Sequence, residues 1–292
     1  MFAIQESTKY TFSGHDTFHC RSLWLKKGYD YLLLNKKFSN DDAVVELGVG
    51  KNMVTAIRYW MKAFGLSDAD DQPTELAHWI FDDSKGFDPY LEDEGTLWLL
   101  HFHLVVNNHA SIYSLIFNTY RRLKIEFSLK DFLQYIGRLS STTSNLNVSD
   151  STIESDFNAF AKIYYTDSNA KSKDEGFTGI LTDLNLLGYK KEDKLFYIAN
   201  AERHNLPVDI LLYGILMTNK GSNSISYQKL EDEKNQVGSI FALNQEGLVS
   251  KIEALASQHE SIVFSDQAGI MELQFKSELP PYQVLFNYYA NV

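Results

Sequence analysis

The sequence predicts a mainly α-helical protein with small β-hairpin wings, built from tandem helix-turn-helix or winged-helix-like modules. Apolar residues recur at helical spacing along most of the chain, and two alternating segments each predict a hairpin after a set of helices. Since the 292 residues exceed one average domain of about 150, we expect more than one unit. These are an N-terminal helical helix-turn-helix domain over 1–125, a middle winged-helix-like domain over 126–205 and a C-terminal winged-helix-like domain over 206–292.

Composition excludes several classes of protein. Apolar residues make up 44% of the chain and aromatic residues 14%, so each unit can bury a core. No stretch approaches the ~18 apolar residues that span a bilayer, and the start of the chain lacks the pattern of a signal peptide. We therefore expect a cytoplasmic protein with no membrane partner. The single Cys20 excludes an internal disulfide framework and a cysteine-based zinc site, so no zinc is expected.

The first predicted block contains a helix-turn-helix pattern. Residues 12–18 are typical of a turn, and 22–34 have the apolar spacing of a helix. A short helix over 41–47, a break at Gly48-Val49-Gly50 and a longer helix over 52–64 follow. This order can place the second helix in a DNA major groove, although any antiparallel helix pair shares the pattern.

The rest of the first block is predicted to form its interior. An acidic turn over 88–95 leads into a helix over 96–107 that is apolar on nearly every side, which indicates burial. Within this helix His101 and His103 would point about 200° apart, so they cannot bind one metal ion together. A further helix over 112–124 ends in basic residues, which suit the negative end of its dipole.

The other two blocks share one order of elements. In the middle block we expect helices over 129–137, 152–165 and 180–187, a charged loop over 169–176, and a hairpin at 188–198. The last block is predicted to have helices over 208–217, 226–230 and 245–257, a hairpin pairing 261–265 with 271–276, and a final helix over 282–289. Helices followed by a hairpin are typical of a winged helix.

Charge restricts how the chain could bind DNA. With 38 acidic and 27 basic residues the net charge is −11, the opposite of a nonspecific DNA coat, so any contact needs a local basic face. The candidate DNA-binding residues are Lys51, Asn52, Arg58, Lys26, Arg121 and Arg122. Lys51 is placed for a phosphate and Asn52 for a base edge or the backbone. Alternatively, these residues are solvated helix faces.

The glycine-rich turn before Lys51 does not predict nucleotide binding. Gly48-Val49-Gly50-Lys51-Asn52 lacks the spacing of a Walker motif and follows a predicted helix where that motif follows a strand. We therefore expect no ATP as a cofactor.

Several long segments resemble a known family. FSGHDTFHCRSLWLKKGYD (12–30), LGVGKNMVTAIRYWMKAFGL (47–66) and DPYLEDEGTLWLLHFHL (88–104) resemble blocks of an uncharacterised bacterial domain family that includes the SspB-like DNA-nicking component of single-strand DNA phosphorothioation systems. ESDFNAFAKIY (154–164) and VGSIFALNQEGL (237–248) fit as well, so the resemblance covers essentially the whole chain. One departure is Asp16, where the family pattern would have Glu.

The resemblance implies a DNA-nicking subunit acting on double-stranded DNA. Its partners would be the cysteine desulfurase, sulfurtransferase and ATPase components of the same system, and the chain could form a homodimer. Nicking commonly uses a divalent metal, Mg²⁺ or Mn²⁺, held by carboxylates. On a helix Asp88 and Glu92 would share a face and could hold such an ion. Alternatively, the acidic run stabilises the N-terminus of the following helix.

Three residues are candidates for catalysis. His15 could act as a general base or contact phosphate beside Asp16, with Arg21 steadying the anion. Alternatively, His15 closes its turn by hydrogen bonding. No single motif supplies a complete nuclease site, so a non-catalytic winged-helix DNA-binding adaptor or regulator that recruits modification enzymes remains an alternative, as does a scaffold that contacts only proteins.

Overall fold

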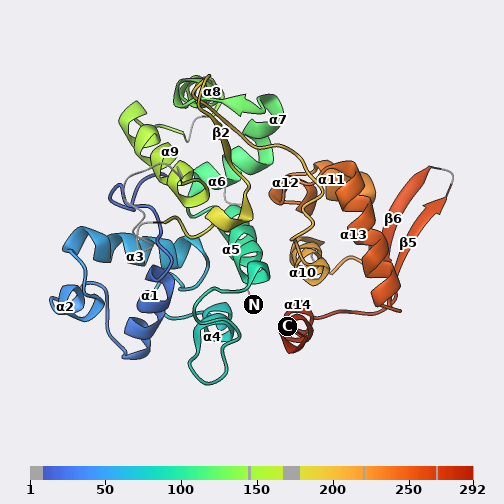
Figure 1. Ribbon diagram of the computed structural model, residues 1–292, viewed down its shortest axis with the longest axis horizontal. Helices are drawn as coiled ribbons and strands as arrows, with labels where there is room; N and C mark the ends of the chain where they lie inside the picture. Colours follow the sequence, from blue (N-terminus) through green and yellow to red (C-terminus); the bar gives the residue numbers. More distant parts are fainter. Residues whose placement is uncertain (1–8, 144–145, 167–177, 220, 268, 292) are drawn as a thin grey trace.

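The computed structural model describes residues 9–143, 146–166, 178–219, 221–267 and 269–291. Helices dominate the described part, and two small three-stranded antiparallel sheets accompany them (Figure 1). The predicted fold class, mainly α with small β wings, is confirmed at this level. No helix among the described residues is long and apolar enough to cross a membrane.

The first block is entirely helical. Its elements are α1 (Trp24–Leu33), α2 (Ala43–Leu47), α3 (Lys51–Ala63), α4 (Glu75–Phe81), α5 (Glu94–Val106), α6 (Ser111–Leu115), the π-helical turn η1 (Ile116–Tyr120) and α7 (Arg121–Leu123). The predicted short helix, turn and longer helix are confirmed. Helix α4 was not predicted from the sequence; Thr74 caps it by accepting a hydrogen bond from the N–H of Ala77. The single helix predicted over 112–124 is divided by η1.

The middle block combines helices with a small sheet. It contains β1 (Glu126–Phe127), α8 (Leu129–Thr142), α9 (Asp150–Tyr164), the 3-10 turn η3 (Thr182–Leu184), β2 (Gly188–Lys190) and β3 (Leu195–Tyr197), with strand order β1-β3-β2. A capping box between Ser128 and Asp131 starts α8, which runs beyond the predicted end at Gly137. The helix predicted over 180–187 is only η3, and the loop predicted over 169–176 lies outside the described residues.

The last block also combines helices with a small sheet. Its elements are α10 (Val208–Asn219), β4 (Ser224–Ser226), α11 (Tyr227–Asp232), α12 (Val237–Ile240), α13 (Gln245–Gln258), β5 (Ile262–Gln267), β6 (Ile270–Phe275) and α14 (Pro281–Ala290). The predicted hairpin is confirmed as β5 and β6, which pair from Ile262↔Phe275 to Gln267↔Ile270. Both blocks have a third short strand, β1 or β4, that was not predicted. The assignment of winged-helix modules stays a prediction.

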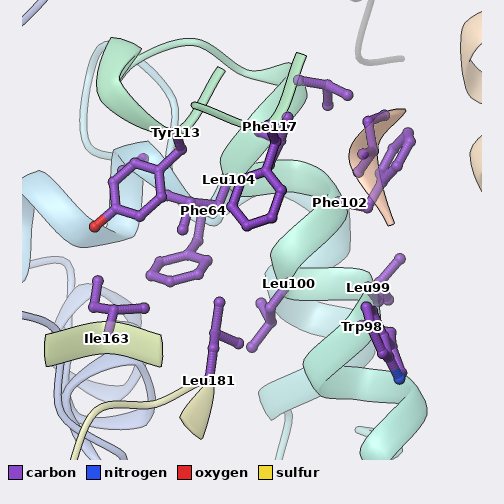
Figure 2. Packing of buried hydrophobic residues seen from close by; sticks show 14 of the residues in the cluster. Phe64, Trp98, Leu99, Leu100, Phe102, Leu104, Tyr113, Phe117, Ile163 and Leu181 are labelled. Carbon is purple, nitrogen blue, oxygen red and sulfur yellow. The ribbon is translucent and has the colours of Figure 1, made fainter. Parts of the chain in front are cut away.

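The centre of the molecule is α5. Its side chains are buried on every side, and Figure 2 shows Leu100 and Phe102 of α5 in one packed region with Tyr113, Phe117 and Leu181. Because α5 packs against α6, η3 and α10, a single core extends through all three blocks.

Two buried histidines of α5 join it to later segments. His101 Nδ1 lies 2.7 Å from Tyr164 Oη and its Nε2 2.8 Å from the carbonyl oxygen of Ile240. His103 Nε2 lies 2.9 Å from Tyr213 Oη. The prediction that these histidines do not form a common metal site agrees with their separate partners.

The C-terminal helix returns to the first block (Figure 1). α14 packs along α10, Tyr288 donates a hydrogen bond to Asp93 at 2.9 Å, and Tyr289 Oη lies 2.8 Å from Thr96 Oγ1. The last block therefore contacts the first, and the bridge between Ala201 and Leu243 connects it to the middle block. The division into three domains stays a prediction.

Candidate nucleic-acid interface

The second helix of the helix-turn-helix, α3, presents a polar face to solvent. Lys51, Asn52, Thr55 and Arg58 are exposed, whereas the opposite face is buried against α1 and α2. Helical geometry produces this separation, because residues three or four positions apart share a side of the helix. Gly48 ends α2 in the left-handed conformation, with φ 63°, and so allows the tight turn that orients α3.

A carboxylate neutralises the second half of this face. Asp71 accepts a hydrogen bond from Arg58 Nε at 2.9 Å and pairs with Arg58 Nη2 at 2.8 Å and with Lys62 Nζ at 2.9 Å. Burial by itself would raise the pKa of Asp71, but its bonds to Arg58 and Lys62 hold that pKa below the usual value. Among the described residues no ion pair involves Lys51, so the free positive charge lies at the start of α3.

A strained loop packs against the middle of α3. Four of its residues have left-handed backbone angles: Ser13 (φ 69°), Gly14 (102°), Asp16 (45°) and Thr17 (67°). A side chain on Gly14 would place its Cβ 2.7 Å from Cδ2 of Tyr59, so only glycine allows this approach. The indole of Trp60 donates a hydrogen bond to the carbonyl oxygen of Phe18 at 3.0 Å. The structure thus brings the predicted catalytic loop and the predicted DNA-binding helix together.

His15 belongs to this loop, and its side chain is buried. The residue is 2% exposed, and its ring stacks on Trp60 with centroids 5.6 Å apart. His15 Nε2 lies 3.0 Å from Oδ1 of Asp156 in α9, and Asp156 also accepts the N–H of Ser13 at 2.9 Å. His15 thereby closes the turn, which is the alternative considered from the sequence. No described residue hydrogen-bonds to His15 Nδ1, and the burial of the ring leaves it out of reach of a duplex in this conformation.

The other two candidate catalytic residues differ from His15 in their surroundings. Asp16 is exposed, and the guanidinium of Arg21 lies over the ring of Trp24 at 5.1 Å from its centroid. A catalytic role for these three residues stays a prediction.

Three candidate DNA-binding residues have structural partners. Lys26 is buried and pairs with Asp30 and Asp83 at 2.5 and 2.7 Å. Arg121 is also buried and donates to Asn200 and to backbone carbonyl oxygens. Arg122 is exposed, but it donates to the carbonyl oxygens of residues 231 and 232. These side chains hold segments of the fold together, and we do not include them in the proposed interface.

The candidate metal ligands do not form a cation site. Asp88 lies in a turn before α5, where its carboxylate accepts the N–H of Glu92 at 2.8 Å and of Asp93 at 3.1 Å. Glu92 is exposed, and the helix begins only at Glu94. No group of three or more His, Cys, Asp or Glu side chains that could hold a metal occurs in the part of the chain that the structure describes. Asp88 and Glu92 therefore do not share a face of a helix, contrary to the prediction, because both precede α5.

Comparison with known proteins identifies the family. The model of the family described as "Protein of unknown function (DUF4007)" matches residues 12–289. The chain belongs to this family. Two solved structures are similar to it, an SspB crystal structure with a TM-score of 0.85 and a magnesium ion-bound SspB crystal structure with a TM-score of 0.86. In both cases the identity is 29%, and the alignment covers 96% of this chain and 88% of the SspB chain. A search of the curated proteins found no match.

The family resemblance inferred from the sequence is thus confirmed, while two residues that hold the candidate side chains in place were missed. Asp156 lies within a segment quoted for the resemblance, 154–164, so that segment was the available signal for it. No sequence pattern indicated Asp71. It pairs with Arg58 from the loop after α3, where the backbone of Asp71 itself is left-handed with a φ of 60°.

Proposed function

We propose that this protein is the DNA-engaging component of a bacterial phosphorothioation system, similar in role to SspB. The observation that supports this role most directly is the free polar face of Lys51, Asn52 and Thr55 on the second helix of a helix-turn-helix. The family membership and the two SspB structures support the assignment to this kind of system. Its partners would be the cysteine desulfurase, the sulfurtransferase and the ATPase of the same system.

In this proposal the start of α3 contacts the duplex. Lys51 binds a phosphate, Asn52 a base edge or the backbone, and the dipole of α3 adds positive potential at the same end. The remainder of an acidic chain, with net charge −11, repels DNA and restricts binding to this face. The exposed side chains of Asp16 and Thr17 lie on the loop beside α3.

Two activities follow from this placement. Strand nicking requires His15 to become accessible, and the strain in the loop over residues 13–17 lowers the cost of a second loop conformation. A non-catalytic adaptor that recruits the modification enzymes is the second candidate, favoured by the burial of His15 and Asp88.

The binding experiment compares variants of the free face. Lys51→Ala removes one phosphate contact, so we expect duplex affinity to fall about three- to tenfold and the slope of log affinity against log salt to become shallower by about 0.9. Lys229→Ala, an exposed lysine of α11 in the last block, is the matched control and should change neither. Fluorescence anisotropy with a labelled duplex over a salt series measures both quantities. Equal losses in the two variants would contradict the proposal.

A substitution that should raise the duplex affinity provides a second test. Asp71→Asn removes the carboxylate that neutralises Arg58 and Lys62, and asparagine also tolerates a left-handed backbone. We expect duplex affinity to rise by about threefold at low salt and by less at high salt. Unchanged or weaker binding by a folded Asp71→Asn protein would place the DNA elsewhere.

Plasmid relaxation separates nickase from adaptor. Supercoiled plasmid is incubated with the protein in Mg²⁺ or Mn²⁺, with and without chelator and with the candidate partner proteins. Open-circle product that is lost with chelator and with His15→Gln supports nicking, provided that His15→Gln still binds the duplex. Binding without product in every condition supports the adaptor.

A further inference from the structure

A second site lies far from α3 in the sequence, beside the middle sheet. An open cavity of about 610 Å³ is bounded by the end of α9, by η3 and by β2 and β3, and its lining includes Tyr165, Thr182, Asn185, Tyr189, Tyr197 and Arg203. Its volume is in the range of small-molecule sites. One carboxylate, Asp183, also lines it and is exposed to solvent.

Arg203 brings a cation without a carboxylate to this cavity. Its Nη2 donates to the carbonyl oxygen of Ala199 at 2.7 Å, and its Nε is buried with no hydrogen-bond partner. Among the described residues no acidic side chain forms an ion pair with Arg203, which is half-buried as a whole residue. Burial lowers the pKa of this guanidinium to about 10. The residue also has a left-handed backbone, with φ 52°.

A second guanidinium strengthens the local positive charge. Arg121 is buried and donates to Asn200 and to the carbonyl oxygens of Phe117 and Ser239, which are all neutral acceptors. Burial first, and then the charges of Arg122 and Arg203, lower the pKa of Arg121 to about 9. Arg121 does not line the cavity, but its charge acts on Arg203 and adds to the positive potential that favours an anion at Arg203.

Tyrosine rings form the wall of the same cavity. The rings of Tyr165 and Tyr189 have centroids 5.8 Å apart. Tyr197 lies directly over Gly188, where a Cβ would come within 2.2 Å of Cζ of the ring, so glycine is needed for this placement. Aromatic side chains beside a cationic groove are the combination by which proteins bind unpaired nucleotides.

We propose that this cavity binds a nucleotide, with its phosphate on Arg203 and its base against Tyr165 and Tyr189. Thr182 and Asn185 supply further polar groups in the lining. The nucleotide is either a free mononucleotide or one unit of an unpaired DNA strand, because both present the same phosphate and base. The site does not depend on duplex binding by α3.

Isothermal titration of the full chain with three probes tests the proposal: dAMP, a six-nucleotide single strand of deoxyadenosine and inorganic phosphate. We expect a nucleotide probe to bind, Arg203→Gln to weaken it at least tenfold, and Tyr189→Leu to weaken it about tenfold. Arg138→Gln, an exposed arginine of α8 that is not in the lining, is the matched control and should stay within twofold of the unsubstituted protein.

The outcomes are distinct. Tighter binding of the single strand assigns the site to a DNA strand, and tighter binding of dAMP assigns it to a free nucleotide. Failure of all probes, unchanged binding by Arg203→Gln, or equally tight binding of inorganic phosphate overturns the proposal. Thermal melting checks that each variant is folded. If Arg203→Gln is unfolded, the nucleotide affinity of Tyr189→Leu tests the proposal in its place. Lys51→Ala should leave nucleotide affinity unchanged, which separates this site from the interface at α3.

Discussion

At the scale of single residues, buried polar side chains connect segments that are far apart in the sequence. His15 and Asp156 fix the first loop to α9, and His101 contacts Tyr164 on one side and the backbone of Ile240 on the other. These contacts form only in the folded state. Removing one partner therefore leaves the other polar group buried without a hydrogen bond.

The buried histidines of α5 predict a dependence of stability on pH. Burial lowers the pKa of both His101 and His103 to about 3, whereas an unfolded histidine titrates near 6.5. The folded protein therefore keeps both neutral while the unfolded chain takes up protons, and stability falls as the pH falls from about 6.5 toward 3. Between pH 6.5 and 5 each histidine should cost about 2 kcal/mol.

Urea denaturation at pH 7 and pH 5 measures this dependence. His103→Gln removes one titrating group and keeps a polar partner for Tyr213, so its loss of stability between the two pH values should be smaller by about 2 kcal/mol. An equal loss in the variant and the unsubstituted protein would assign the acid sensitivity to other groups.

At the scale of elements, the turn between α2 and α3 decides where the candidate interface points. Its two glycines differ in one respect: Gly48 has a φ of 63°, whereas Gly50 has the ordinary φ of −68°. A Cβ would meet no atom within 4 Å at either position, so an alanine clashes with no neighbouring atom in either variant.

This pair of glycines gives a matched prediction. Gly48→Ala should destabilise the fold by about 1 kcal/mol, because alanine disfavours the left-handed conformation. Gly50→Ala should be close to neutral: its φ of −68° suits alanine and alanine restricts the unfolded chain, but Gly50 is the N-cap of α3, where alanine is less favourable than glycine. Urea denaturation of both variants measures the difference, and equal effects would mean that the turn differs from the one described.

At the scale of the whole molecule, α5 passes through a core that all three blocks share. Phe102 packs against Phe241 with ring centroids 6.1 Å apart. A Cβ on Gly214 would lie only 3.2 Å from the ring of Phe102. The fold is therefore expected to lose its blocks together when this core is disturbed.

Truncation of Phe102 tests this cooperativity. Phe102→Ala should cost about 3–5 kcal/mol and lower the midpoint of a single calorimetric transition. Tyr90→Ala, at a side chain that is 65% exposed, should cost less than about 1 kcal/mol. Two transitions, of which Phe102→Ala shifts only one, would show instead that the blocks unfold independently.

Local patterns in the sequence determined most of the helices, both hairpins and the family. Helical period identified α1, α3 and α5, and turn residues marked both β-hairpins, because these signals lie within a few consecutive residues. The short strands β1 and β4 were missed, since each pairs with a strand that is distant in the sequence, β3 or β6, and has no hairpin turn beside it as a signal.

Only the tertiary structure decided which candidate side chains are accessible. Lys51 and Arg58 lie on one helix and carry the same charge, yet Asp71 neutralises Arg58 from beyond the helix end. His15 is buried because α9 supplies Asp156 from 141 residues away. Burial and charge pairing depend on neighbours brought together by folding, so the identity of a residue and its local pattern could not predict them.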